Sequence, residues 1–117
     1  MRDLKTQVEQ LNQMILEGKL LDAFEKFYDD AVVMQENNYP ARDGKALNRQ
    51  YEEAFVNGLT EFRSAKVVNT LISDDLVVTE WWFDYTHKEY GIRKYTQVAV
   101  QRWKNGKIVE EKFYYNN

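Results

Sequence analysis

The stretch VAVQRWKNGKIVEE, residues 98–111, predicts two antiparallel strands joined by a tight turn at Asn105 and Gly106. Because strand side chains alternate between the two faces of a sheet, Gln97 and Gln101 share one face, called the glutamine face below. A sheet face that carries amides is more typical of a ligand pocket than of an apolar core. The direction in which the glutamine face points therefore decides how the fold can work.

The length of the turn at Asn105 sets the phase of the last strand. Asn105 and Gly106 can form a two-residue loop, or residues 104–106 can form a three-residue loop with the glycine in the left-handed conformation. A difference of one residue moves every later side chain to the other face, Ile108 included. We favour the three-residue loop, because it adds a largely apolar set with one carboxylate to the glutamine face: Val109, Glu111, Phe113 and Tyr115.

The turn KEYG, residues 88–91, sets the register on the other side of the same strand. A four-residue loop places Glu80 opposite Ala99, and the favoured loop at the second turn places Glu111 opposite Ala99 as well. The two glutamates would then lie roughly 10 Å apart, separated only by a methyl group. Carboxylates in one partly desolvated cavity raise each other's proton affinity. Glu80 and Glu111 are therefore the candidate catalytic acid and base.

Helical periodicity fills the first half of the chain. Apolar residues at helical spacing predict a helix over residues 2–17, before Gly18: Leu4, Val8, Leu11 and Ile15. KLLDAFEKFY predicts a second helix, and a strand follows at about 31–37. Asp43 can cap a third helix that ends at Gly58. Three positions define its expected apolar face: Leu47, Tyr51 and Phe55.

The second half of the chain has the composition of β-strands. Four segments rich in Val, Thr and aromatic residues are separated by short turn sequences: 61–73, 76–87, 92–104 and 107–115. Helices followed by consecutive antiparallel strands predict an α+β domain, with the helices packed on one face of a curved sheet. The 117 residues contain no repeat or linker, so we expect a single domain over residues 1–117.

The composition excludes several classes of function. A net charge of −3 and dispersed basic residues argue against a nucleic-acid surface. No apolar run approaches the roughly 20 residues of a membrane helix, and the first residues lack the apolar stretch of a secretion signal, so we expect a cytoplasmic protein. With His87 as the only histidine and no cysteine, the sequence predicts no metal site and no cofactor.

Three segments together resemble the SnoaL-like branch of the nuclear transport factor two-like superfamily, which includes ketosteroid isomerase and limonene epoxide hydrolase. They are FYDDAVV at 27–33, VVTEWWFDYTHKEYG at 77–91 and WKNGKIVEEKFYY at 103–115, with THxxxG and NGKIxEE as the more specific pieces. The resemblance covers nearly the whole chain. It implies a cone-shaped domain whose curved sheet encloses a pocket, with the glutamine face inside, and homodimers that pair through the outer sheet faces.

The catalytic residues of these relatives are not retained. The ketosteroid isomerase positions would fall near Leu11, near Gln35 and on Ala99, and the SnoaL cyclase base would also fall near Ala99. The Asp-Arg-Asp set of limonene epoxide hydrolase would map to Trp82, Glu80 and Phe113. The resemblance therefore leaves open whether the protein is an enzyme.

Together these features predict a protein that binds a small, largely apolar or amphipathic molecule. A finer hypothesis is isomerase, cyclase or hydratase chemistry through Glu80 and Glu111. The predicted ligand-binding residues are Gln35, Trp82, Gln97, Ala99, Gln101, Phe113 and Tyr115, with Glu36 as an alternative lining residue if its strand bulges. The alternative function is a non-catalytic dimerisation or interaction module whose pocket is filled by Trp and Phe side chains.

Simpler interpretations exist for the charged residues. Each glutamate could instead form a structural ion pair, for example with Arg93 or Arg49, because buried charges need partners. Lys45 and Arg49 are expected on a solvated face of the third helix.

Overall fold

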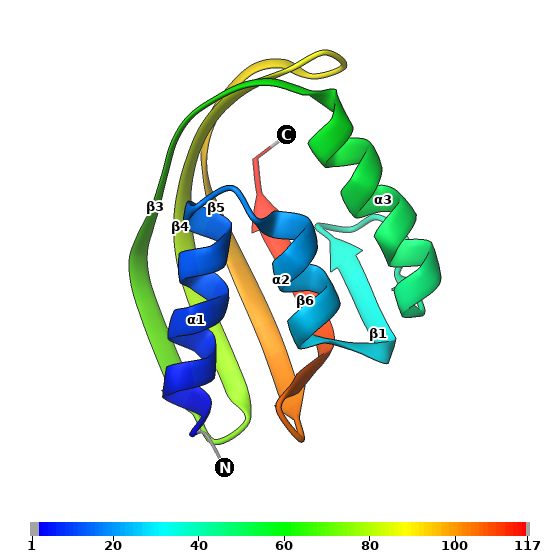
Figure 1. The fold of residues 1–117 in the computed structure, drawn as a ribbon, viewed down its shortest axis with the longest axis vertical. Coiled ribbons are helices and arrows are strands. Elements are labelled where there is room, and N and C mark those ends of the chain that lie inside the picture. The colour runs from blue at the N-terminus through cyan, green and yellow to red at the C-terminus, as the bar shows by residue number, and fades with distance from the viewer. Residues whose placement is uncertain (1–2, 117) are drawn as a thin grey trace.

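The computed structural model describes residues 3–116 as three helices and a six-stranded sheet (Figure 1). The elements are α1 (Leu4–Leu16), α2 (Leu20–Phe27), β1 (Tyr28–Glu36), β2 (Arg42–Asp43), α3 (Lys45–Gly58), β3 (Leu59–Ser73), β4 (Leu76–His87), β5 (Gly91–Lys104) and β6 (Lys107–Tyr115). The strand order is β2-β1-β6-β5-β4-β3, antiparallel except for the parallel pair β1 and β6. Within the described residues no helix is long and apolar enough to cross a membrane.

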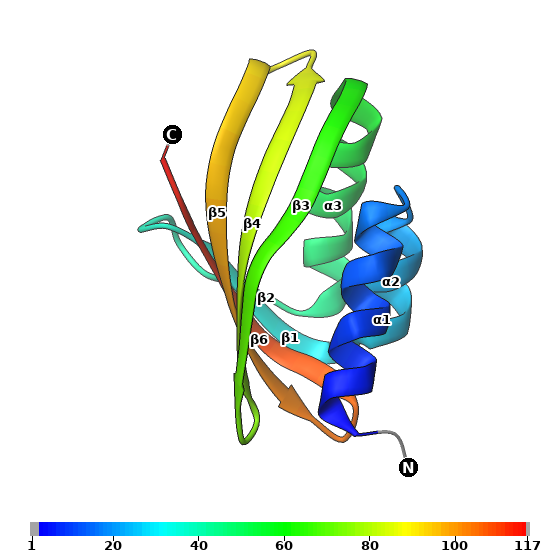
Figure 2. The same cartoon turned by 90° about the vertical axis from the view of Figure 1, so that its left-hand side faces the viewer.

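The helices cover the concave face of a strongly bent sheet, as Figure 2 shows from the side. This arrangement confirms the predicted α+β class and the curved, mainly antiparallel sheet. The first predicted helix is present as α1, which begins at Leu4, while the predicted start at residue 2 lies outside the described residues. The Asp3 side chain caps α1 by accepting a hydrogen bond of 2.8 Å from the backbone N–H of Thr6. Val8 and Leu11 of α1 are buried against the sheet, in a core that also includes Phe24, Phe27, Val32, Met34, Val77, Trp103 and Ile108.

The predicted apolar face of the third helix is only partly present: Phe55 packs against Tyr85 and His87 of the sheet, but its two partners do not face inward. Leu47 and Tyr51 are 40% and 52% exposed, so they do not form a buried stripe. The side of α3 turned inward instead carries Asn48, which is fully buried and donates to the carbonyls of Arg42 and Gly44. Anchoring this amide rotates the two apolar residues toward solvent.

The start of α3 also differs from the prediction. Asp43 does not cap the helix, because it belongs to β2 and pairs with β1. The residue before the helix is Gly44, whose φ of 93° turns the chain from β2 into α3 without a side-chain cap. Lys45 is buried rather than solvated and donates to the carbonyl of Glu25 at 2.9 Å, while the Arg49 guanidinium binds the Glu25 carboxylate.

The hairpin between β4 and β5 has a three-residue loop instead of the predicted four-residue loop. His87 pairs with Gly91, and Gly91 has a φ of 76°, so the glycine enters the ladder in the left-handed conformation. The register on β4 therefore differs by one residue from the prediction. Thr79, and not Glu80, lies opposite Ala99.

The hairpin between β5 and β6 has the two-residue loop, so the favoured three-residue loop is wrong. Lys104 pairs with Lys107. Asn105 and Gly106 have φ values of 53° and 77°, the two positive angles that this tight turn requires. By itself this loop would move every later side chain of β6 to the opposite face.

A β-bulge restores the predicted face for the end of β6. Trp103 pairs with Ile108. Ile108 was predicted to face outward, but it is fully buried. The register then shifts at Val109, which has no partner on β5. The predicted position of Val109 on the glutamine face, opposite Gln101, is therefore wrong. Beyond the bulge, Glu111 lies on the glutamine face as predicted, where it pairs with Gln101.

The end of α3 is fixed by close contact with His87. The His87 ring stacks on Phe55, with ring centroids 5.5 Å apart, and its Nε2–H donates to the Phe55 carbonyl at 3.1 Å. Its Nδ1 accepts the N–H of Glu89, which fixes the orientation of the ring. Gly58 leaves the space that this ring occupies, since a Cβ at this position would overlap it.

We predict that Gly58→Ala destabilises the domain by about 1–3 kcal/mol, because the His87 ring must move and its hydrogen bonds are strained. The measurement is chemical denaturation, with Asn57→Ala, an exposed position of the same helix, as the control. A Gly58→Ala variant as stable as Asn57→Ala would show that the His87 ring is free to move.

Candidate functional site

A chain of buried hydrogen bonds on the glutamine face ends at Glu111. The indole Nε1–H of Trp103 donates to Gln101 Oε1 at 3.0 Å, and the Gln101 amide donates to Glu111 Oε2 at 2.7 Å. The Tyr28 hydroxyl donates to the other oxygen, Oε1. Both carboxylate oxygens are therefore held by donors from two different parts of the sheet.

Local sequence explains why these groups meet. Tyr28 ends α2 and begins β1, which runs parallel to β6, and the bulge in β6 turns Glu111 toward it. Glu111 is 2% exposed, and this desolvation raises the pKa of its carboxyl group to about 7, although the donors Tyr28 and Gln101 act in the opposite direction. Burial and the Glu111 charge raise the pKa of Tyr28 far above its usual value, so its hydroxyl keeps the proton that it donates.

A second carboxyl group, Glu52, approaches this site from α3. Burial first, and then the charges of Glu111 and Glu36, raise its pKa to about 8, while Arg42 acts in the opposite direction. Its side chain keeps part of its surface accessible. Among residues 3–116, Glu52 has no hydrogen-bond or ion-pair partner. It is thus a protonated carboxyl group at neutral pH, with its hydrogen-bonding capacity unused.

The third carboxylate of the site, Glu36, is fully paired. It accepts a hydrogen bond of 2.6 Å from the Tyr115 hydroxyl and forms an ion pair of 2.9 Å with Arg42. Arg42 also donates to Asn48 and stacks on the Tyr51 ring at 4.3 Å. The Arg42 guanidinium is thus engaged by Glu36 and acts on Glu52 only at longer range, so the site favours a protonated Glu52.

Aromatic rings continue the concave face beyond the carboxyl groups. Tyr95 contacts Tyr115 at 5.5 Å between ring centroids, and its hydroxyl lies 2.7 Å from that of Tyr85. Phe83 and Phe55 pack against the same rings. Phe83, Tyr95 and Tyr115 remain partly exposed, so this face keeps apolar surface that a ligand could cover.

The structure places most of the predicted ligand-binding residues on this face. Gln97, Ala99, Gln101, Phe113 and Tyr115 belong to it by register and alternation. Glu36 joins them, and the β1–β6 register shifts between Tyr28 and Val33, an irregularity like the one proposed for this strand.

Three predicted site residues lie elsewhere. Glu80 pairs with Val98 on the outer face and accepts a hydrogen bond from Asn69, so it does not share a cavity with Glu111. The one-residue error at the first hairpin also moves Trp82 to the outer face, and Trp81 takes its place beside the glutamines. The same alternation places Gln35 outside, where it donates to the carbonyl of Tyr39.

The structural ion pairs suggested for the two glutamates, with Arg93 or Arg49, do not form either. Arg49 binds Glu25, and Arg93 donates to the carbonyl of Asn116 and lies over the Tyr95 ring. Neither arginine is paired with Glu80 or Glu111. In the part of the chain that the structure describes, no three His, Asp or Glu side chains are arranged to hold a metal ion.

Sequence reasoning missed Glu52 because it relied on the apolar residues of α3. The signal present was a polar stripe at helical spacing, Lys45, Asn48 and Glu52, whose first two members are buried and whose third faces the carboxyl site.

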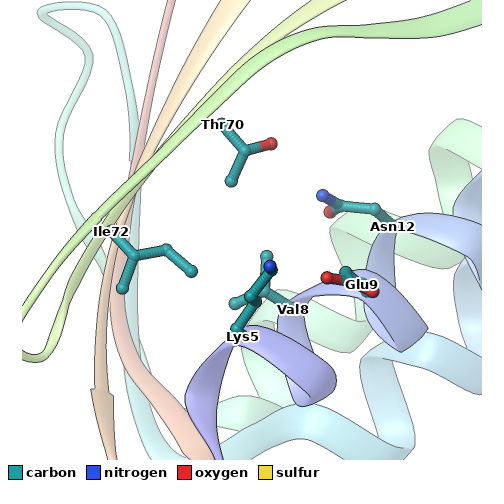
Figure 3. Close-up of a pocket in the computed structure, with 6 residues that line it drawn as sticks. All are labelled: Lys5, Val8, Glu9, Asn12, Thr70 and Ile72. Carbon is teal, nitrogen blue, oxygen red and sulfur yellow. The ribbon is translucent and has the colours of Figure 1, made fainter.

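Two hollows elsewhere flank α1. One, of about 260 Å³, lies between α1 and β3 (Figure 3), and another, of about 530 Å³, lies by the β3–β4 and β5–β6 turns.

Comparison with known proteins gives a family and a fold. The SnoaL-like domain model matches residues 8–111. No curated protein sequence is significantly similar to the chain. A structure from Mesorhizobium loti, provisionally named a SnoaL-like polyketide cyclase, is 24% identical and has a TM-score of 0.86, covering 97% of this chain and 100% of that one.

Two further structures show the same fold at lower identity. A provisionally named isomerase from Bacillus subtilis is 21% identical with a TM-score of 0.80, covering 99% of this chain and 90% of that one. A protein of unknown function with a cystatin-like fold, from Xanthomonas campestris, is 15% identical with a TM-score of 0.83, covering 99% and 92%. At these identities the likeness establishes the architecture alone.

The raised pKa values of Glu52 and Glu111 predict how stability changes with pH. Between the unfolded pKa near 4.5 and the folded values of about 7 and 8, the folded state binds more protons than the unfolded state. Stability is therefore greatest at the acid end of this window and declines as pH rises through it. We expect the wild-type Tm to fall by at least roughly 5 °C between pH 5 and pH 8.

Glu52→Gln imitates the protonated carboxyl group and should flatten this decline, as calorimetry at the two pH values would measure. Glu53→Gln, on the exposed side of the same helix, removes one carboxylate without touching the site and serves as the control. Equal slopes for the two variants would contradict the assignment to Glu52.

Proposed function

Because this chain belongs to the SnoaL-like domain family, within the nuclear transport factor two-like superfamily, we propose that it binds a small, largely apolar molecule on the concave face of its sheet. The ligand contacts the rings of Phe83, Tyr95 and Tyr115 with its apolar body. A polar group of the ligand reaches the Glu52 carboxyl group. The observation that carries the proposal is a carboxyl group that is desolvated, without a partner among the described residues, and partly accessible.

Proton transfer is the chemistry that this arrangement supports. A carboxyl group with a pKa of about 8 is protonated at neutral pH and can donate to a carbonyl or ether oxygen of a ligand. Glu111 is enclosed and its two oxygens are already engaged, so it acts as a positioning residue whose charge, after burial, raises the proton affinity of Glu52. Isomerisation and cyclisation both need such a group, and structural neighbours carry provisional names of both kinds.

A thermal-shift screen would identify a ligand class, since a molecule bound only by the folded state raises Tm. The panel comprises steroids, polyketides and terpenoid epoxides. With a compound that binds and turns over, Glu52→Gln should lower kcat by about 100-fold or more and leave Kd nearly unchanged. Glu111→Gln should shift the pH profile of kcat instead. Wild-type rates in both variants would remove the carboxyl groups from the mechanism.

We also propose that the protein forms a homodimer through the outer face of its sheet. Apolar side chains gather on this face: Leu71, Val78, Trp82, Val98, Val100 and Tyr114. Leu71 on the edge strand β3 and Tyr114 on β6 are 68% and 47% exposed in the single chain, so this face presents large apolar side chains to solvent. A twofold contact would cover this surface with its own copy.

Val98→Glu should convert such a dimer into a monomer, because Val98 lies at the middle of this face, between Glu80 and Tyr114. Sedimentation equilibrium measures the change in mass. Leu47→Glu, on the exposed side of α3, provides the matched control at a surface that the dimer does not use. A monomeric wild-type protein would overturn the proposal.

A further inference from the structure

The hollow between α1 and β3 has the construction of a binding pocket. Figure 3 shows Lys5, Val8, Glu9 and Asn12 of α1 facing Thr70 and Ile72 of β3 across it, and we call it the α1–β3 pocket. Its volume of about 260 Å³ is a little below the roughly 300 Å³ at which sites for drug-sized ligands begin. The space therefore suits a molecule of about one ring.

The amide of Asn12 is the polar group that points into this pocket. Asn12 is 7% exposed, and its side-chain amide makes no hydrogen bond with any residue from 3 to 116. Figure 3 shows its amide directed across the pocket toward the side chain of Thr70. A ligand group that hydrogen-bonds this amide would therefore gain a contact that the fold itself does not use.

A second unsatisfied group lies next to the pocket. Thr79 is 1% exposed, and its hydroxyl is the buried side-chain polar atom without a hydrogen-bond partner in the described structure. Thr79 pairs with Thr70, so the two side chains are neighbours on the concave face. Asn12 and Thr70 thus supply the uncharged polar groups of the pocket, and Thr79 lies behind Thr70 on the neighbouring strand.

We propose that the α1–β3 pocket binds a small neutral molecule that presents one hydroxyl or carbonyl group on an apolar body. An amide both donates and accepts, so Asn12 fits either group. The two charged residues that line the pocket, Lys5 and Glu9, have opposite signs and give it no net charge. A charged ligand would also lose hydration without gaining a buried counter-ion.

This pocket is separate from the carboxyl site. One row of paired residues crosses the concave face from Phe113 on β6 through Ala99 and Thr79 to Thr70 on β3. Three strand spacings separate its ends, roughly 14 Å. A ligand of one ring in the α1–β3 pocket therefore does not reach Glu111, and its binding does not depend on the proton-transfer proposal.

Benzyl alcohol and toluene are the probes that test the assignment, since they share a ring and differ in one hydroxyl group. In ¹⁵N NMR titrations of the whole protein, benzyl alcohol should shift the side-chain amide signals of Asn12 and bind more tightly than toluene. Asn12→Leu should weaken benzyl alcohol at least about five-fold and change toluene less than two-fold. Thr70→Val provides a second variant at an exposed position, with a smaller loss for the alcohol alone.

Glu111→Gln should leave benzyl alcohol affinity unchanged, which separates this site from the carboxyl site. Equal affinity of the wild-type protein for the two probes, or shifts centred on Gln101 and Trp103 instead of Asn12, would overturn the proposal. Undiminished benzyl alcohol binding in Asn12→Leu and in Thr70→Val would do the same.

Discussion

The buried carboxyl group of Glu111 imposes the constraint that the rest of the interior satisfies. A group of this kind is costly to enclose unless donors surround it, and here they come from Tyr28 at the junction of α2 and β1 and from Gln101 on β5. Trp103 in turn fixes the Gln101 amide. The hydrogen bonds therefore tie the parallel β1–β6 pair to the antiparallel part of the sheet. Moving any of these strands by one residue would leave a carboxyl group buried without a partner.

The same constraint explains the unusual orientation of α3. A helix that packed Leu47 and Tyr51 inward would bring apolar surface against Glu36 and Glu111 and would remove the Arg42–Asn48 contact. With the polar side inward, Asn48 and Arg42 are satisfied. Glu52, one turn further along, then receives no donor among the described residues and is left with a raised pKa. Packing of the scaffold thus leaves this carboxyl group without a donor as a consequence.

The sequence was sufficient to predict where the helices and strands lie, but not which face of the sheet each strand side chain occupies. Apart from the two-residue strand β2, periodicity located the helices and strands to within a few residues, because helix-ending glycines and β-rich segments are local signals. The faces depended on two turns of ambiguous length, where Gly91 entered the ladder and Asn105–Gly106 formed the shorter loop. The bulge at Val109 cancelled the second error for Glu111, while nothing cancelled the first error for Glu80. Long-range pairing decides such positions, and no local pattern contains it.

Polar groups of the interior fall into two kinds, and the difference bears on function. Tyr28, Gln101 and Asn48 have their partners within the fold and stabilise it. Glu52, Asn12 and Thr79 lie among residues that could have supplied partners, and none of those described does so. An apolar side chain of similar size would cost the fold less at each of these positions. The paired groups are explained by the fold alone, whereas the unused hydrogen-bonding capacity of the second kind is what supports the binding proposed at these positions.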